Sequence, residues 1–544
     1  MRREPPDWSN LVVAPLLVLL LTWPMPLRPT WLLAHPLGEG TNHHWMFWRA
    51  LQDLPVANWP AGIDIPLMDP INLPFALGGL VHPALAYNGV VLAGLLLAYA
   101  GAWVFARELE AGPWGSMIAG IAAASAPALG AAADFGISEA LPVGWLGFHA
   151  ACLLALARPG STRRALLLAL GAGLTLAAFV LAGWYHALFG LIVEVGLVIW
   201  TLVRARALRT LKPGLLGLAG AQGLLALALI LPRLLAFLEI RELWSYRWVK
   251  HSPFPPEFRP AWRSLPAFGT DLLNLVLPSL DTVEVSKCVY VGLVGLALAL
   301  CARKRAPLLL AAPLYLLSLG HWLSVGGQTR HFERIITLPG AWLVDWFPAL
   351  VGLSHWQRAA VPASFLVAVA VGLGAARLIE RFPWAAWGLP VLLVADALAL
   401  SQTPWPRPMT PTKPPKIYAS LQGEGALIEL PFDNHRKQFT TEQPRRSNLW
   451  QPFHGKPVAE NHEGDDELIR TNRWVRTVDE NCRRATPVAT LSIPEGVDSV
   501  LLQGEWCARA EQVTELLTEQ LGPPAVVVRE DRLWFVLGPE ISNP

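Results

Sequence analysis

Long apolar runs constrain the fold of this 544-residue chain more than any other feature of its sequence. A helix that crosses a bilayer needs about 20 mainly apolar residues. About eleven runs approach this length. They lie near residues 10–27, 84–106, 113–133, 140–157, 165–182, 184–203, 214–236, 288–302, 306–323, 361–378 and 387–401. The sequence therefore predicts a mainly α, polytopic transmembrane helix bundle over residues 1–402.

The composition supports the same class. Apolar residues make up 53% of the chain and charged residues 15%, whereas soluble domains carry roughly 25% charged residues. A soluble protein of this length would need a more charged surface, so a purely soluble protein is excluded. The formal net charge of +2 excludes a strongly basic nucleic-acid binder. We therefore expect the lipid bilayer, and no nucleic acid, as a partner.

The positions of the basic residues predict the topology. If the N-terminus lies inside, every short inner connection is basic, as the positive-inside rule requires. These connections carry Arg2, Arg3, Arg107, Arg158, Arg163, Arg164, Arg204, Arg206, Arg209, Lys212, Arg303, Lys304, Arg305, Arg377 and Arg381. The predicted topology is N-in and C-out, with long outer segments at 28–83 and 237–287.

The character of the chain changes after the last predicted span. Residues 403–415 are rich in proline and predict a stiff, extended linker. Residues 416–544 predict an extracytoplasmic α/β domain, with strands at 425–431 and 498–503, a helix at 511–521, and a hairpin from 525–528 and 533–537. Cys482 and Cys507 are its only cysteines, so they form either a disulfide in an oxidising compartment or two separate thiols.

The first outer segment holds the first candidate functional residues. Glu39 and Asn42 stand before Trp45 and Trp48, whose helical spacing predicts a short helix in the membrane interface. Asn42 has an ordinary alternative role as the cap of that helix. His43 and His44 are adjacent, so they face different sides of a helix and make a poor metal pair.

Two other regions near the predicted outer face are charged. The segment 237–287 includes Arg241 and Arg247, which either form a solvated face or hold a phosphate head group at the membrane surface. Glu139 precedes a predicted span. A carboxylate at the rim of a membrane helix is costly unless it is paired or functional, so Glu139 is a candidate site residue.

Several short motifs occur in a characteristic order along the chain. They include Gly136-x-x-Glu139 with Trp145, Trp184-Tyr185-His186, His355-Trp-Gln-Arg358 with Pro362, and Ala426-Leu-Ile-Glu-Leu-Pro431. Together they resemble bacterial polytopic membrane proteins related to the GT-C glycosyltransferases, over nearly the whole chain. The resemblance implies transfer of a sugar from a polyprenyl-phosphate donor to a glycan, lipid or protein acceptor on the outer face of the bacterial inner membrane.

The resemblance also implies roles for individual residues. The first outer loop of the related group reads Gly-Asp-x-x-Asp, and its carboxylate acts as the base or helps to bind metal and acceptor. Here Glu39 and Asn42 occupy the two positions, and an amide cannot accept a proton as a carboxylate does. The implied catalytic residues are Glu39, Asp64 and Asp69, and a divalent cation, Mg or Mn, is a candidate cofactor. Acceptor-binding or supporting roles fall to Asn42, His43, Glu139 and His186. The donor phosphate would meet Arg241, Arg247 or Arg358.

Two other functions stay open on the sequence alone. The chain could be a catalytically inactive GT-C-like scaffold, because the second carboxylate of the loop is absent. It could also be a lipid-handling or transport protein of the cell envelope, which would need polar groups near the middle of the membrane. The spans offer Glu194, Gln222 and Asp396, and Glu194 could simply pair between helices.

Overall fold

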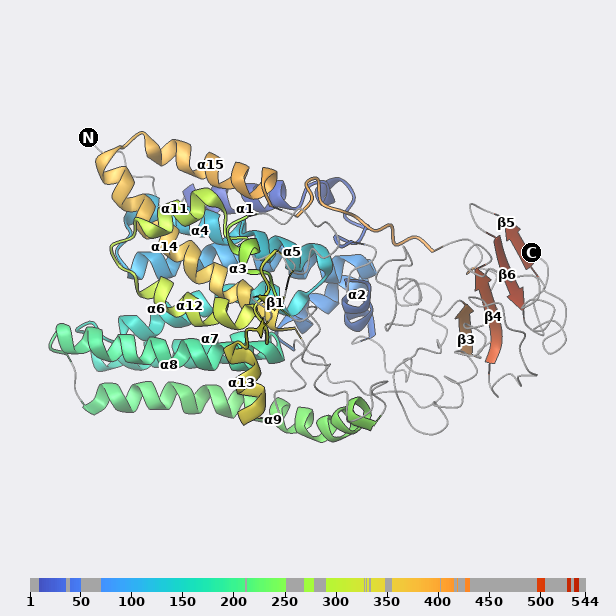
Figure 1. Cartoon of the computed structure of the whole chain (residues 1–544), viewed down its shortest axis with the longest axis horizontal. Coiled ribbons are helices and arrows are strands. Elements are labelled where there is room, and N and C mark those ends of the chain that lie inside the picture. Colours follow the sequence, from blue (N-terminus) through green and yellow to red (C-terminus); the bar gives the residue numbers. More distant parts are fainter. Residues whose placement is uncertain are drawn as a thin grey trace.

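The computed structural model describes residues 9–35, 40–49, 70–210, 213–250, 269–277, 290–326, 328, 330–331, 334–347, 355–401, 403–414, 418, 426–430, 497–503, 526–529 and 533–537. The long helices lie roughly along the long axis of the molecule and form one bundle, whereas the short helices α2 and α13 run across it (Figure 1). They are α1 (Ser9–Leu21), α2 (Gly40–Arg49), α3 (Pro83–Glu108), α4 (Gly112–Ala124), α5 (Pro127–Phe135), α6 (Gly144–Ala155), α7 (Thr162–Leu181), α8 (Trp184–Ala207), α9 (Pro213–Lys250), α11 (Leu293–Leu300), α12 (Ala306–Ser318), α13 (Pro339–Trp346), α14 (Ala360–Arg381) and α15 (Ala385–Ala399).

Helices fall on all the apolar runs that the sequence marks. Six segments of the described residues are long and apolar enough to cross a membrane: Pro83–Glu108, Gly112–Phe135, Thr162–Leu181, Leu188–Ala207, Leu216–Leu235 and Trp356–Arg381. Helices α1, α12 and α15 are apolar but shorter. The predicted class, a mainly helical membrane bundle, is therefore confirmed, whereas the count of eleven spans stays a prediction.

One predicted span is divided into two helices. The run 113–133 consists of α4 and α5, and Ala126 between them has an extended ψ of 124°. Pro127 explains the break, because proline lacks an N–H and disfavours helical geometry in the residue before it. Helix α5 lies at the same end of the bundle as α2 (Figure 1).

Helix α14 forms the centre of the bundle and is buried along most of its length. It packs against α3, α4, α11 and α12. Small residues let these backbones approach closely: a Cβ added to Gly115 of α4 would lie 2.7 Å from the carbonyl oxygen of Gly372. In lipid, such close packing replaces the hydrophobic effect as the main source of helix association.

A polar network joins four helices within the apolar region. His149 Nε2 of α6 lies 2.5 Å from Glu194 Oε2 of α8, and its Nδ1 lies 3.0 Å from the carbonyl oxygen of Ala172 on α7. Gln222 of α9 donates through Nε2 to Glu194 Oε1 at 2.5 Å. Glu194 therefore pairs between helices, as one interpretation of the sequence held. Asp396 is likewise engaged, accepting hydrogen bonds from the Tyr290 hydroxyl and the Val294 N–H.

Removing the Glu194 carboxylate is expected to destabilise the bundle. A Glu194→Ala variant leaves the His149 and Gln222 donors in apolar surroundings, so we expect a loss of about 1–2 kcal/mol in the free energy of unfolding. Thermal unfolding in detergent measures the change, with the exposed Glu380→Gln as a matched control. A variant as stable as the parent chain would show that the network contributes nothing.

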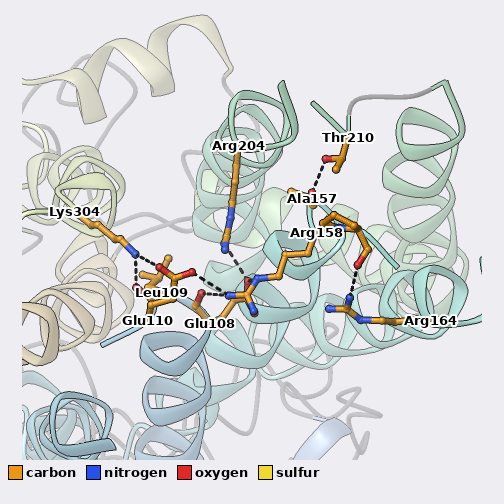
Figure 2. A network of polar contacts seen from close by, with 10 residues as sticks. Glu108, Leu109, Glu110, Ala157, Arg158, Arg164, Arg204, Thr210 and Lys304 are labelled. Carbon is orange, nitrogen blue, oxygen red and sulfur yellow. Dashed lines mark hydrogen bonds and ion pairs between the residues drawn. The ribbon is translucent and has the colours of Figure 1, made fainter. Parts of the chain in front are cut away.

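The basic residues of several predicted inner loops gather at one end of the bundle. Figure 2 shows Arg158, Arg204 and Lys304 around two carboxylates at the end of α3. Glu108 Oε1 lies 3.1 Å from Arg158 Nε and 3.0 Å from Arg204 Nη1, and Glu110 lies 3.0 Å from Lys304 Nζ. The hydrogen bond from Lys304 lowers the pKa of Glu110 below its ordinary value. Loops far apart in sequence thus meet at the end that the charge pattern predicts to be inner.

The described part of the C-terminal region is a four-stranded sheet in the order β3-β4-β6-β5. Its strands are β3 (Ala426–Leu430), β4 (Val497–Gln503), β5 (Val526–Arg529) and β6 (Leu533–Leu537). β3 and β4 are parallel, and the other pairs are antiparallel, including the expected β5–β6 hairpin. The predicted helix 511–521 lies outside the described residues, so an α/β domain over 416–544 stays a prediction.

Candidate functional site

A buried ion pair forms the centre of the candidate site. Glu139 lies in the 3-10 turn η3 (Ser138–Val143) that leads from α5 into α6, and Arg358 lies in the turn η9 (Trp356–Ala359) that leads into α14. Arg358 Nη1 donates to Glu139 Oε1, and the two side chains are only 9% and 5% exposed. A buried charge is stable only when it is paired, so each residue fixes the other in the apolar bundle.

The turn between α7 and α8 leaves space for this carboxylate. Gly183 lies in that turn, and a Cβ added to it would lie 2.8 Å from the Cβ of Glu139. Any larger residue at position 183 would push η3 away from the turn. Gly183 therefore lets η3 approach the start of α8, where Tyr185 and His186 are located.

Helix α2, in the segment 28–83 that the sequence predicts to be outer, packs on the ion pair. His43 Nε2 lies 3.6 Å from Glu139 Oε2, and His43 Nδ1 lies 2.5 Å from the hydroxyl of Ser138. At the start of α2, a Cβ added to Gly40 would lie 3.4 Å from the Cα of Gly136. The helix that the sequence predicts after Asn42 begins at Gly40, which puts Asn42 within its first turn instead of at the cap.

The Tyr185 ring also contacts the Arg358 guanidinium. The Arg358 Cζ atom lies 4.8 Å from the ring centroid of Tyr185, a cation–π contact. The Tyr185 hydroxyl lies 3.2 Å from His355 Nδ1 and also accepts the His355 backbone N–H at 3.2 Å. His186 is fully buried: its ring stacks on Phe179, and its Nδ1 lies 3.1 Å from the Phe179 carbonyl oxygen.

The segment before α2 is held against the same region. The backbone N–H of His35 donates to the carbonyl oxygen of Asp134 at 2.7 Å, and burial lowers the pKa of His35 below its ordinary value. Asn88 of α3 accepts from the Leu33 N–H and donates to the carbonyl oxygen of Trp31. Residues 31–35 are therefore fixed on both sides.

The structure brings together four of the residues predicted from the sequence: His43, Glu139, His186 and Arg358. The backbone of Arg241 and Arg247 belongs to α9, at the edge of the bundle in Figure 1. Five other predicted residues lie outside the described part of the chain: Glu39, Asp64, Asp69, Cys482 and Cys507. Asn42 belongs to α2, but its side chain also lies outside the described part.

Sequence reasoning missed three members of this cluster: Ser138, Tyr185 and His355. Tyr185 and His355 stand beside predicted residues in the motifs Trp184-Tyr185-His186 and His355-Trp-Gln-Arg358, so the signal was present but was not assigned to them. Ser138 directly precedes Glu139. Its contact with His43 depends on the packing of two segments 95 residues apart.

Within the described residues, no group of three or more histidine, cysteine, aspartate or glutamate side chains could hold a metal ion. Glu139 does not fit this role, because Arg358 already neutralises its carboxylate. The residues that would suit a divalent cation, Glu39, Asp64 and Asp69, lie outside the described part of the chain, so the predicted Mg or Mn ion remains a prediction.

Comparison with known proteins shows the fold. No family model and no curated protein matches the sequence. The structure is similar to the arabinofuranosyltransferase AftD from Mycobacteria, with a TM-score of 0.55 and 14% identity, over 100% of this chain and 41% of that chain. It is also similar to ArnT from Cupriavidus metallidurans bound to undecaprenyl phosphate, with a TM-score of 0.50 and 13% identity, over 99% of this chain and 100% of that chain. Both neighbours are GT-C glycosyltransferases. This chain spans less than half the length of AftD.

Proposed function

We propose that this chain, which has the fold of the GT-C membrane glycosyltransferases, transfers a sugar from a polyprenyl-phosphate-linked donor to an acceptor on the outer face of the membrane. The observation that carries the proposal is the buried Glu139–Arg358 pair, with His43 of the first outer helix packed on it. The undecaprenyl phosphate bound to ArnT supports a lipid phosphate as ligand, because it occupies a protein of the same fold.

Arg358 is the proposed phosphate ligand. A guanidinium is planar, permanently charged, and matches the geometry of phosphate oxygens with two parallel donors. Its position at the start of the central helix α14, with Tyr185 on one side and Glu139 on the other, fixes its orientation. A fixed cation at this place stabilises the negative charge that the phosphate gains as it leaves the sugar.

Glu39 is the proposed general base. The acceptor hydroxyl oxygen attacks the anomeric carbon, while the bond from that carbon to the phosphate oxygen breaks and its electron pair stays on the phosphate. The hydroxyl proton passes to the carboxylate of Glu39, and attack from the face opposite the phosphate inverts the configuration. Glu39 directly precedes Gly40, which packs near Gly136 at the end of α5. Asp64 and Asp69 belong to the same outer segment and are the proposed assisting carboxylates.

A transfer assay tests this proposal. The purified protein in detergent is incubated with radiolabelled polyprenyl-phosphate sugars and a membrane-lipid or glycan acceptor extract, with Mg²⁺, with Mn²⁺ and with EDTA. We expect label in the acceptor, and loss of transfer in EDTA only if Glu39, Asp64 and Asp69 hold a cation. Glu110→Gln, at the other end of the bundle, is the control and should keep full activity. Absence of transfer from every donor tested would contradict the enzymatic function.

One observation favours a second candidate, a GT-C-like scaffold that binds lipid phosphate without reacting. Asn42 stands where the related group has a second carboxylate, and an amide cannot take a proton. In this case undecaprenyl phosphate would bind and the binding would depend on Arg358, yet no sugar would be transferred. The binding and transfer measurements together therefore distinguish the two functions.

A further inference from the structure

The proline-rich segment after α15 packs against the bundle instead of leaving it as a free spacer. We refer to residues 403–412 as the strap. Trp405 Nε1 donates to the carbonyl oxygen of Leu20 at 3.0 Å. Arg407 donates through its backbone N–H to the Trp23 carbonyl oxygen at 2.8 Å and through Nε to the Leu21 carbonyl oxygen at 2.9 Å. The first half of the strap is thereby attached to the end of α1.

The second half of the strap pairs with the segment that precedes Glu39. Leu32 and Thr410 exchange both backbone hydrogen bonds, at 2.9 and 2.8 Å, as an antiparallel pair. The Thr410 hydroxyl donates to the Ala34 carbonyl oxygen, and the Thr412 hydroxyl donates to the Thr30 carbonyl oxygen. Leu32, Thr410 and Thr412 are all buried. Four hydrogen bonds therefore hold residues 30–34 on the strap.

A buried ion pair completes these contacts. Arg407 Nη1 lies 2.6 Å from Asp134 Oδ2, with side chains 9% and 2% exposed. Asp134 lies at the end of α5, five residues before Glu139, and its carbonyl oxygen accepts the N–H of His35. Arg407 thus connects the three segments that meet here: the end of α1, the end of α5 and the strap.

We infer that Arg407 is a positioning residue of the candidate site, an inference that rests on the proposed function. It holds the strap on the end of α1 and on Asp134, ahead of Glu139. Through Thr410 and Thr412 of the strap, and through the Asp134 carbonyl oxygen, it supports residues 30–35, which lead to α2. Without its guanidinium, Asp134 becomes a buried carboxylate without its cation, and the contact between α5 and the strap weakens. Helix α2, with His43, then loses its alignment with Glu139 and Arg358, although Arg358 keeps its own partners.

Misalignment of this kind reduces the rate of the chemical step more than donor binding. We expect Arg407→Gln to lower kcat by about 10²-fold, with the KM for the donor within about threefold because Arg358 is unchanged. Arg407→Lys keeps the charge and should retain more of kcat. A folded Arg407→Gln variant with unchanged kcat would overturn the inference. So would a variant in which the KM for the donor rises about 10²-fold while kcat stays unchanged.

A cross-link between positions 32 and 410 holds the segment ahead of α2 on the strap independently of the guanidinium. The Cα atoms of such an antiparallel pair are about 5.5 Å apart, within the range for a disulfide. We therefore expect Leu32→Cys/Thr410→Cys to form the 32–410 disulfide, seen by non-reducing peptide mapping. When Arg407→Gln is added to this cysteine pair, the yield of the 32–410 disulfide should fall. The fraction of protein that does form the disulfide should regain kcat, and dithiothreitol should remove the gain. No recovery in the oxidised fraction would contradict a positioning role.

Hydrogen exchange separates failure of this inference from failure of the proposed function. If the chain with Arg407 transfers no sugar, the proposed function fails, but the amides of α2 still report on positioning. Arg407→Gln should then raise their exchange, and the oxidised cysteine pair should lower it again. Unchanged exchange in α2 would show that Arg407 does not hold the first outer segment.

Discussion

Replacing Arg358 with methionine is expected to lower the free energy of unfolding by about 3–5 kcal/mol, because the change leaves Glu139 as a buried carboxylate without its cation. The pair is almost fully buried, so water cannot compensate. Binding of undecaprenyl phosphate should also be lost. Thermal unfolding in detergent measures the first effect, and titration of the protein with the lipid phosphate measures the second.

A double variant separates the two consequences. Arg358→Met/Glu139→Leu removes both charges and fills the space with apolar side chains of similar size, an exchange that is often neutral for stability. We therefore expect stability close to the parent chain, with lipid-phosphate binding still absent. Arg377→Met, an exposed arginine at the far end of α14, is the matched control and should change neither property. Retained binding in the double variant would exclude Arg358 as the phosphate ligand.

Replacing Glu39 with glutamine is expected to lower transfer by about 10²–10⁴-fold, since a positioned general base contributes a factor of this size. The amide is nearly the same size as the carboxylate but cannot accept the acceptor proton. Donor binding should stay unchanged because the phosphate is held by Arg358. The transfer assay with radiolabelled donor measures the rate, and the lipid-phosphate titration measures the binding.

Asp64→Asn and Asp69→Asn provide the comparison for this variant. As assisting carboxylates of the same outer segment, they should lower transfer by less than Glu39→Gln. A Glu39→Gln variant with full activity would exclude Glu39 as the base. If an Asp64 or Asp69 variant lost all transfer instead, the base would be assigned to that aspartate.

The sequence predicted part of the site and missed the rest for identifiable reasons. Glu139 was a candidate because a carboxylate at the rim of a membrane helix is costly, and the structure supplies the missing cation. Arg358 and His43 were named through the resemblance, but nothing in the sequence indicated that both contact Glu139. The strap was expected to be an extended linker, because proline composition reports backbone stiffness and not the surface on which the chain packs.

What the sequence determined by itself is the class of fold and the position of its helices. Transfer of an apolar segment into lipid depends on that segment's own residues, and the positive-inside rule depends on the charges beside it, so both are readable locally. Only the tertiary structure decided which residues meet at the α2 end of the bundle. Glu139 and Arg358 are 219 positions apart, and Asp134 and Arg407 are 273 apart. Such pairs depend on how the backbones pack; for example, Gly183 leaves the space that Glu139 occupies. A single apolar run carries no information about which helices will be its neighbours.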